Sequence, residues 1–364
     1  MGFLKNIFKA KDEPIYSNQD FWDWFRKHEK AFFTAVKMGN NIEKDFFDKL
    51  APKLKEIKEG FFFVTGMFNE STTELILTAD GVVKNIPFIE GLVDAAPVID
   101  GWKFTALKPA LPIADVSIQM GGYKFNSGNI NFYANEHSRF PDEIDITIVH
   151  ADLNESNQST VINGVYIFLD NFLGELNFAT TIDNLKVVGK AEVGKELIPV
   201  EKLKQFLTWR EKEFIEKYEG LRHDTEKDNY SMLEATLKNG HPLLAVINQN
   251  LLDWDGKASH PWIVNIEIKY DGKGNNGMPD NNTYSLMSAI EDEIMEELKD
   301  IDGYLNVGRQ TAEGVREVYL ACKDFRKPSK ILYTLKQKYS AKINLDYDIY
   351  KDKYWQSFDR FINR

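Results

Sequence analysis

Strict alternation of apolar and polar side chains near the C-terminus is the sequence feature that most constrains the fold. Every second residue from Trp262 to Tyr270 is apolar, and the same alternation returns between Ile343 and Ile349. Successive side chains of a β-strand point to opposite faces of its sheet, so each stretch predicts a strand with one buried face. The last hundred residues must therefore contain a sheet with one apolar side.

Two helical patterns and two further strands lie between these alternating stretches. One apolar stripe at helical spacing falls within residues 283–299, and a second follows Pro328. Residues 304–308 and 315–323 predict two strands joined by a turn that carries Gly314. The resulting order is β-α-β-β-α-β, the split βαβ or ferredoxin-like pattern. We therefore predict a four-stranded antiparallel sandwich with both helices on one face and the strand from Trp262 at its centre.

The first 220 residues mix helical and strand patterns in a less regular order. Helices are predicted at 18–59 (two), 87–96, 157–176 and 200–219, and strands at 61–68, 74–78, 102–107, 144–149 and 184–188. Residues 124–133 predict a pairing across Ser127-Gly128. The mixed order indicates the α+β class. We predict a tail at 1–16, an α+β domain at 17–220, a polar linker at 221–240 and the ferredoxin-like domain at 241–364.

Charge and cysteine content limit the partners and the compartment. The net charge is −11, whereas affinity for nucleic acid depends on neutralising phosphates, so we predict no nucleic-acid partner and favour a protein partner, for example a basic protein. Cys322 is the single cysteine, which excludes an intramolecular disulfide and fits a cytoplasmic location. No apolar run approaches the roughly 20 residues of a transmembrane helix. Met1–Lys11 is weakly amphipathic, and a frayed terminus is favoured over a membrane-surface helix.

Two glycine-rich motifs invite a nucleotide-binding interpretation that their context opposes. Gly272–Gly277 spells GxGxxG, but Pro279 and three polar residues separate it from the next helix, whose N-terminus should hold a pyrophosphate. Residues 189–196 are one residue short of a P-loop, and Glu196 replaces the hydroxyl residue that would bind magnesium. Flexible glycine loops are the better interpretation, so we predict no cofactor.

No catalytic or metal-binding set emerges from the remaining polar residues. The six histidines lack paired spacing, and the acidic groups at 292–297 and 346–348 are typical of solvated faces. Cys322 alternates with apolar residues and should be buried. The tryptophans Trp22, Trp24, Trp209 and Trp355 are expected to serve packing rather than to stack on a ligand.

One edge of the predicted sandwich gathers groups that could bind an anion. In the β-α-β-β-α-β order, the loop 271–282 and the hairpin 309–316 must lie at the same edge of the sheet. This edge gathers two guanidinium groups, one ammonium group and the exposed amides of a glycine-rich loop. We therefore predict candidate anion or partner binding by Arg309, Arg316, Lys273, Gly272 and Gly274. The alternative is that Asp271, Asp280 and Glu313 satisfy the arginines locally.

Short segments of the C-terminal half resemble a bacterial family known as domain of unknown function 695. The resemblance covers residues 240–355 and rests on Tyr270-Asp271-Gly272, Asn276-Gly277-Met278-Pro279, Val307-Gly308-Arg309 and Gly314-Val315-Arg316-Glu317-Val318-Tyr319. The implied fold type is similar to that of regulator of ribonuclease activity B, which binds and inhibits a ribonuclease. This likeness concerns the fold alone and transfers no residue.

Two functional hypotheses remain open on the sequence. The first is a non-catalytic protein-binding or regulatory module, for example an inhibitor or immunity protein against a basic nuclease, with one sheet face free to dock. The second is an enzyme or small-ligand-binding protein whose site lies in a cleft between the domains. A pocket lined by titratable groups with shifted pKa values would favour the second hypothesis.

Overall fold

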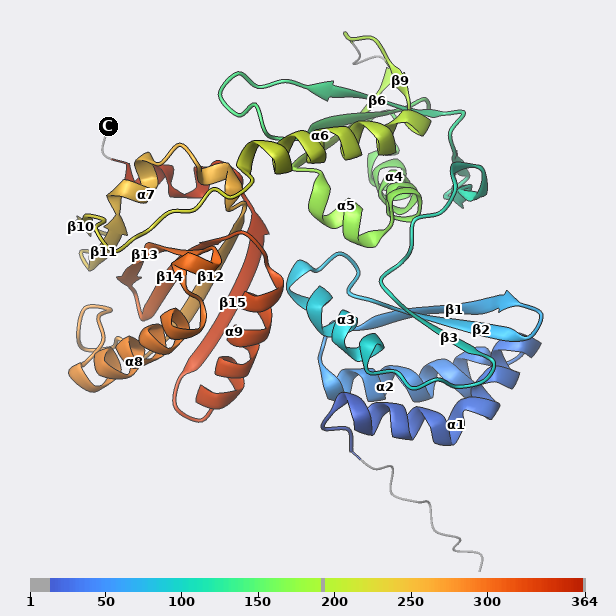
Figure 1. Cartoon of the computed structure of the whole chain (residues 1–364), viewed down its shortest axis with the longest axis horizontal. Helices are drawn as coiled ribbons and strands as arrows, with labels where there is room; N and C mark the ends of the chain where they lie inside the picture. The colour runs from blue at the N-terminus through green and yellow to red at the C-terminus, as the bar shows by residue number, and fades with distance from the viewer. Residues whose placement is uncertain (1–13, 191–193, 363–364) are drawn as a thin grey trace, which may run out of the picture. The chain divides into compact units, whose positions relative to one another are not determined.

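The chain divides into two compact units in the computed structural model, which describes residues 14–190 and 194–362 (Figure 1). The first unit contains residues 1–110 together with 174–176, and the second contains residues 111–173 together with 177–364. Both units combine helices with sheets, and the predicted α+β class is confirmed. The division at residue 110 was not predicted, and the proposed linker 221–240 lies within the second unit. Met1–Lys11 and part of the P-loop-like segment 189–196 lie outside the described residues.

The first unit packs helices against a three-stranded sheet of order β1-β2-β3. Its strands β1 and β2 are antiparallel and β2 and β3 are parallel, with bounds Phe62–Asn69, Thr72–Thr78 and Trp102–Ala106. Its helices α1, α2 and α3 span Asn18–Met38, Asp48–Ile57 and Ile86–Asp94, and a π-helical segment at Glu43–Phe47 precedes α2. Ser17 caps the start of α1, and Gly39 ends the helix in the left-handed conformation (φ 66°).

Aromatic side chains form most of the core of the first unit. Fully buried rings from the helical segments contact one another and the sheet, and they belong to Phe21, Trp22, Phe25, Phe32 and Phe46. A buried carboxylate, Glu175, closes one end of the unit. It accepts hydrogen bonds from the Thr78 hydroxyl (2.5 Å) and from the backbone amides of residues 79, 81 and 108 (3.0–3.1 Å). These bonds satisfy loop amides that would otherwise lack acceptors.

The second unit begins with a mixed sheet of order β8-β7-β6-β9. These strands span Asn184–Gly189, Asp145–His150, Ile130–Asn135 and Ile198–Pro199, and a separate hairpin joins β4 (Ile118–Met120) to β5 (Tyr123–Phe125). Helices α4 (Gln158–Leu173) and α6 (Leu203–Tyr218) pack with β6 and β7 in one apolar cluster. Two predictions were wrong here. Residues 124–133 do not pair with themselves, because β5 pairs with β4 and β6 pairs with β7. The helix predicted at 157–176 stops at Gly174, whose φ of 82° breaks it before α5 (Glu175–Thr181).

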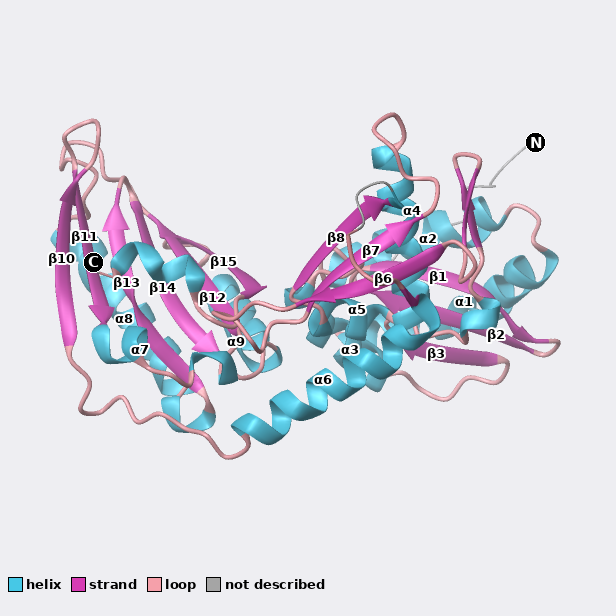
Figure 2. Ribbon diagram, turned by 90° about the horizontal axis from the view of Figure 1, so that it is seen from above, coloured by secondary structure: helices cyan, strands magenta, loops and turns pink. Residues whose placement is uncertain are grey.

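A six-stranded antiparallel sheet forms the remainder of the second unit (Figure 2). Its order is β10-β11-β13-β14-β12-β15, with bounds Tyr230–Thr236, Pro242–Asn248, Tyr304–Ala312, Val315–Cys322, Trp262–Lys269 and Asn344–Lys351. Helix α8 (Asn281–Glu297) follows β12 and helix α9 (Arg326–Tyr339) follows β14, so residues 262–351 run β-α-β-β-α-β. Strand β12 pairs with β14 and β15 and is an interior strand.

The sheet is wider than the four strands predicted, because β13 continues to residue 312 and its far half pairs with β11. On its other side β13 pairs with β14 along its whole length, and that pairing contains a β-bulge between Asn306 and Gly308. At Gly308 (φ 142°) an added Cβ would lie 2.3 Å from the Val246 carbonyl oxygen, so only glycine fits. Strand β10 then extends the sheet through a segment that the sequence predicts as linker.

The sheet face opposite α8 and α9 is not free, which corrects the prediction of an open docking face. Helix α7 (Gln249–Asp253) and the C-terminal 3-10 segment Gln356–Phe361 cover part of it. Tyr319 on this face is 2% exposed and contacts the Phe358 ring. This cover leaves the pockets of the second unit, rather than the sheet, as the places to search for a site.

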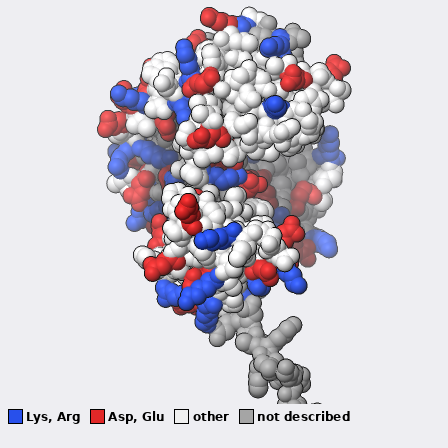
Figure 3. Space-filling view, turned by 90° about the vertical axis from the view of Figure 1, so that its right-hand side faces the viewer, with Lys and Arg blue, Asp and Glu red and all other residues white. Residues whose placement is uncertain are grey.

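Lysine and arginine side chains are interspersed with aspartate and glutamate side chains on the face drawn in Figure 3. The local lining of each cavity, and not the net charge, therefore sets the field that a ligand meets there. Cys322 is buried as predicted, and burial raises the pKa of its thiol well above the ordinary value. Within residues 14–190 and 194–362, no helix is long and apolar enough to cross a membrane.

Candidate functional site

The predicted candidate residues lie at one edge of the six-stranded sheet, and the two loops that carry them contact each other. The Gly314 amide donates to the Gly277 carbonyl at 2.8 Å, and an added Cβ on Gly277 would meet the backbone of Glu313. Gly274 and Lys273 are exposed, and the Lys273 amide donates to the Asp271 carboxylate at 2.9 Å. Gly272 packs its Cα closely against the backbone of Gly277.

The two arginines of this edge turn toward helix α8 and share one carboxylate there. Arg309 Nη1 lies 2.5 Å and Arg316 Nη1 2.7 Å from the carboxylate oxygens of Glu291, and Arg316 is 2% exposed. This partner differs from the predicted ones, Asp271, Asp280 and Glu313. A signal existed, because Glu291 falls on the inward side of α8 between Met287 and Ile294.

A larger candidate site is a pocket of about 430 Å³ between the β6–β7 connection and helix α6. Its polar side is formed by residues 134–138, 141 and 143–145, and its aromatic side by Phe206 and Trp209. Trp209 is 52% exposed, and its ring meets that of Phe206 edge to face. Its place off the apolar stripe of α6, whose buried members are Leu203 and Leu207, is the signal that could have indicated this.

Three carboxylates give the pocket an acidic lining. Glu136 is exposed, whereas the Asp145 side chain is 17% exposed and accepts from Asn135 Nδ2 (2.9 Å) and lies 2.7 Å from His137 Nε2. Glu143 accepts from Asn184 Nδ2 at 3.0 Å and from Gln356 Nε2 at 2.9 Å. Burial, with the nearby negative charge of Asp183, raises the pKa of Glu143 above its ordinary value. The pocket therefore holds more negative charge than its own cations balance.

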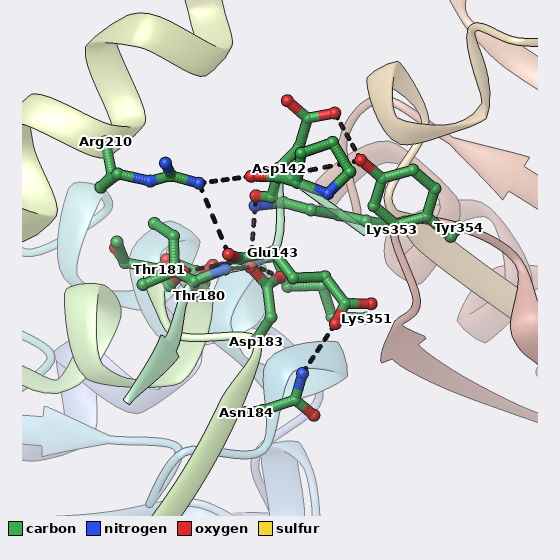
Figure 4. A network of polar contacts seen from close by, with 12 residues as sticks. Asp142, Glu143, Thr180, Thr181, Asp183, Asn184, Arg210, Lys351, Lys353 and Tyr354 are labelled. Carbon is green, nitrogen blue, oxygen red and sulfur yellow. Dashed lines mark hydrogen bonds and ion pairs between the residues drawn. The ribbon is translucent and has the colours of Figure 1, made fainter. Parts of the chain in front are cut away.

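A buried polar network lies directly behind this pocket and ties it to the end of strand β15 (Figure 4). Asp183 Oδ2 accepts from Lys353 Nζ at 2.8 Å and from the Ile144 amide at 2.7 Å, and Asp183 Oδ1 forms an ion pair with Lys351 Nζ at 2.8 Å. Lys351 also donates to the carbonyls of Thr180 (2.6 Å) and Thr181 (3.1 Å). Two ammonium groups thus share one carboxylate whose side chain is 7% exposed.

Asp142 forms the second node of the network, beside the pocket mouth. Its carboxylate accepts from Lys217 Nζ (2.8 and 2.9 Å), the Tyr218 hydroxyl (2.7 Å) and the Tyr354 hydroxyl (2.6 Å). Burial alone would raise the pKa of Asp142, but these hydrogen bonds outweigh it and hold the pKa below the ordinary value. Arg210 Nη2 donates to the Pro141 carbonyl at 2.7 Å and fixes the same connection from α6. The pocket wall is therefore held in place before any ligand binds.

One imidazole–carboxylate pair, His137 and Asp145, lies at the surface of the pocket. Among the described residues, no group of three or more histidine, cysteine, aspartate or glutamate side chains could hold a metal ion. In the described part of the chain, no serine or cysteine is hydrogen-bonded to that imidazole. The sequence could not reveal this site, because residues near 140, 183, 209 and 353 meet only in the folded chain.

Comparison with known proteins connects part of the chain to a family. Residues 228–362 match the model of a family described as "Family of unknown function (DUF695)", which confirms the resemblance noted from the sequence. No curated protein and no solved structure matches the chain. The likeness to regulator of ribonuclease activity B stays a prediction.

Proposed function

We propose that this chain is a non-catalytic, cytoplasmic binding protein that receives a basic segment of a partner protein in its acidic pocket. The observation that carries the proposal is the half-exposed Trp209 ring beside three carboxylates. An indole face is the aromatic surface that best attracts arginine and lysine side chains, and carboxylates complete a cation-binding pocket.

The charges of the pocket support a cationic guest. The raised pKa of Glu143 means that its ionised form lacks compensating positive charge, which an incoming guanidinium would supply. Arg210 is committed to backbone carbonyls, and its Cζ lies 5.9 Å from the Trp209 ring. The net charge of −11 would further speed the approach of a basic partner. An inhibitor or immunity protein that neutralises a basic nuclease is one form that this function takes.

We also infer that residues 262–351 are a ferredoxin-like sandwich enlarged by two strands. The antiparallel order β13-β14-β12-β15 and the alternation of strands and helices support this inference. Strands β11 and β10 are then additions at the β13 edge, which leave β10 as the outer strand.

The test uses fluorescence anisotropy with a labelled arginine-rich peptide, and with the same peptide carrying neutral citrulline at each arginine. The full chain should bind the arginine peptide and not the citrulline peptide. Trp209→Ala should weaken binding at least about fivefold, the equivalent of one cation–π contact. Met232→Ala removes another exposed apolar side chain, outside the pocket, and should bind like the wild type. Equal binding by Trp209→Ala at physiological salt would refute the proposal.

Affinity purification from the native host then identifies the partner. Wild-type bait should retain a stoichiometric basic protein that Trp209→Ala bait loses. An acidic partner, or one that both baits retain equally, would count against the proposed pocket.

A second candidate function is the binding of a small ammonium compound in the same pocket. Its volume of about 430 Å³ falls within the range of small-molecule sites, which favours this candidate. Calorimetric titration with a short diamine separates the two. Tight binding of the diamine without binding of the arginine peptide would replace the protein partner by a small molecule.

A further inference from the structure

We propose that a second, smaller cavity of this unit is a binding site for a small phosphate-class anion. The cavity has a volume of about 220 Å³ and lies where α6 and the end of α5 meet β12, β15 and the start of α9. This volume is below the usual range of sites for larger organic ligands, so the guest must be small. The proposal is independent of the acidic pocket and of its partner.

Four cationic side chains line this cavity: Lys323, Arg326, Lys351 and Lys353. Their neighbours supply three carboxylates. Asp183 is shared by Lys351 and Lys353, Asp324 lies 3.3 Å from Arg326 Nη1, and Glu211 is exposed on α6. Positive groups therefore exceed negative groups by one around a partly buried space. Excess charge of this kind is costly out of water unless an anion balances it.

The protonation of the lysines agrees with this imbalance. Burial, opposed by Asp183 and assisted by the charge of Lys353, lowers the pKa of Lys351 to about 8. Burial, with the charge of Arg222, also lowers the pKa of Lys323. A bound anion would favour the charged form of both ammonium groups, so anion binding and lysine protonation should reinforce each other.

The start of helix α9 adds a second source of attraction for an anion. Asp324, Phe325 and Arg326 line the cavity, and Phe325 is the N-cap of this 14-residue helix. The Phe325 side chain provides no cap hydrogen bond, but Asp324 Oδ1 accepts from the Arg326 amide at 2.8 Å, so the partial positive charge of the helix N-terminus is already compensated in part. Phe214 and Trp262 add apolar walls to the cavity. Tetrahedral oxyanions suit converging ammonium, guanidinium and amide donors, which assigns the phosphate class.

The test is isothermal titration of the full chain with inorganic phosphate and with glycerol phosphate, in a buffer free of phosphate and sulfate. We expect saturable binding at one site per chain. Lys323→Met and Arg326→Met should each weaken it about tenfold, because each removes one charged donor. Lys327→Met removes a 41% exposed lysine of the same helix that does not line the cavity, and it should bind normally.

Each outcome decides the proposal. Binding of inorganic phosphate alone indicates a free-phosphate site, and tighter binding of glycerol phosphate indicates a monoester site. No saturable heat up to about 10 mM phosphate, or unchanged affinity in both well-folded variants by circular dichroism, overturns it. If one variant fails to fold, the other still decides. Trp209→Ala should bind phosphate normally, so loss of peptide binding and loss of phosphate binding are distinguishable.

Discussion

The two cavities of the second unit have opposite electrical characters although they share Ile144 and lie beside the same aspartate. The larger is acidic and carries a half-exposed tryptophan, whereas the smaller is lined by four cations. Burial, assisted by the negative charge of Asp183, raises the pKa of Glu143 in the first cavity, and the same aspartate pairs with Lys351 and Lys353 in the second. The comparison teaches that one buried carboxylate can set the polarity of two sites, whatever the net charge of the chain.

The largest expected effect comes from removing that shared charge. Asp183→Asn leaves two buried ammonium groups without their common partner, and we expect a loss of about 3 to 5 kcal/mol in the free energy of unfolding. Urea unfolding followed by circular dichroism measures it. Glu216→Gln breaks only the exposed Lys212 pair of α6 and should cost less than about 0.5 kcal/mol. Similar losses in the two variants would mean that the shared charge of Asp183 contributes no more to stability than an exposed ion pair does.

A smaller effect should appear as a pH dependence of the basic cavity. Burial lowers the folded-state pKa of Lys351 from the ordinary 10.5 to about 8. The charge of Lys353 adds to this shift, and those of Asp183 and Glu211 oppose it. Between these values the unfolded chain holds a proton that the folded chain has released, so stability rises with pH.

Relative to Lys351→Met, the free energy of unfolding of the wild type should rise by up to about 1.4 kcal/mol per pH unit between pH 8 and pH 10. Below pH 8 the difference between the two proteins should be constant. Urea titrations at intervals of half a pH unit measure it. A difference that is flat throughout would show that Lys351 keeps its ordinary pKa.

The smallest effect concerns the acidic cavity and has the opposite sign. The pKa of Glu143 is raised in the folded chain, so its contribution is present at low pH and is lost as pH rises through that pKa. Glu143→Gln removes the cost of ionisation, and at neutral pH the variant should match or exceed wild-type stability by less than about 1 kcal/mol. Thermal unfolding at pH 4 and pH 7 measures the crossover. Strong destabilisation at neutral pH would show that the ionised form is favoured.

Local periodicity explains which parts of the fold could be predicted. The alternation from Trp262 and the stripe on α8 depend on neighbouring residues, and both elements lie where the sequence predicts them. The pairing of β11 with the far half of β13 joins residues more than sixty positions apart, and β13 carries a bulge next to Gly308. No periodic pattern in the sequence predicts either feature.

The candidate sites show the same limit. The meeting of the 271–282 loop with the 309–316 hairpin follows from the order of strands, but the pairing of both arginines with Glu291 depends on side-chain direction. The acidic pocket joins the β6–β7 connection to helix α6, and the cationic cavity collects residues from six segments of the chain. Sequence spacing does not show that such segments meet. The position of Trp209 off the apolar stripe of its helix does indicate that this one side chain is exposed.

The buried carboxylate of Glu175 has a consequence for synthesis on the ribosome. Its donors lie between residues 78 and 108, so the acceptor is translated 67 residues after the last of them. The nascent first unit can form its helices and sheet early, yet its loop amides at 79, 81 and 108 must remain with water until residue 175 leaves the exit tunnel. Completion of the N-terminal unit is thereby tied to translation of the middle of the chain, and a gene fragment that stops at residue 110 encodes an unfinished unit.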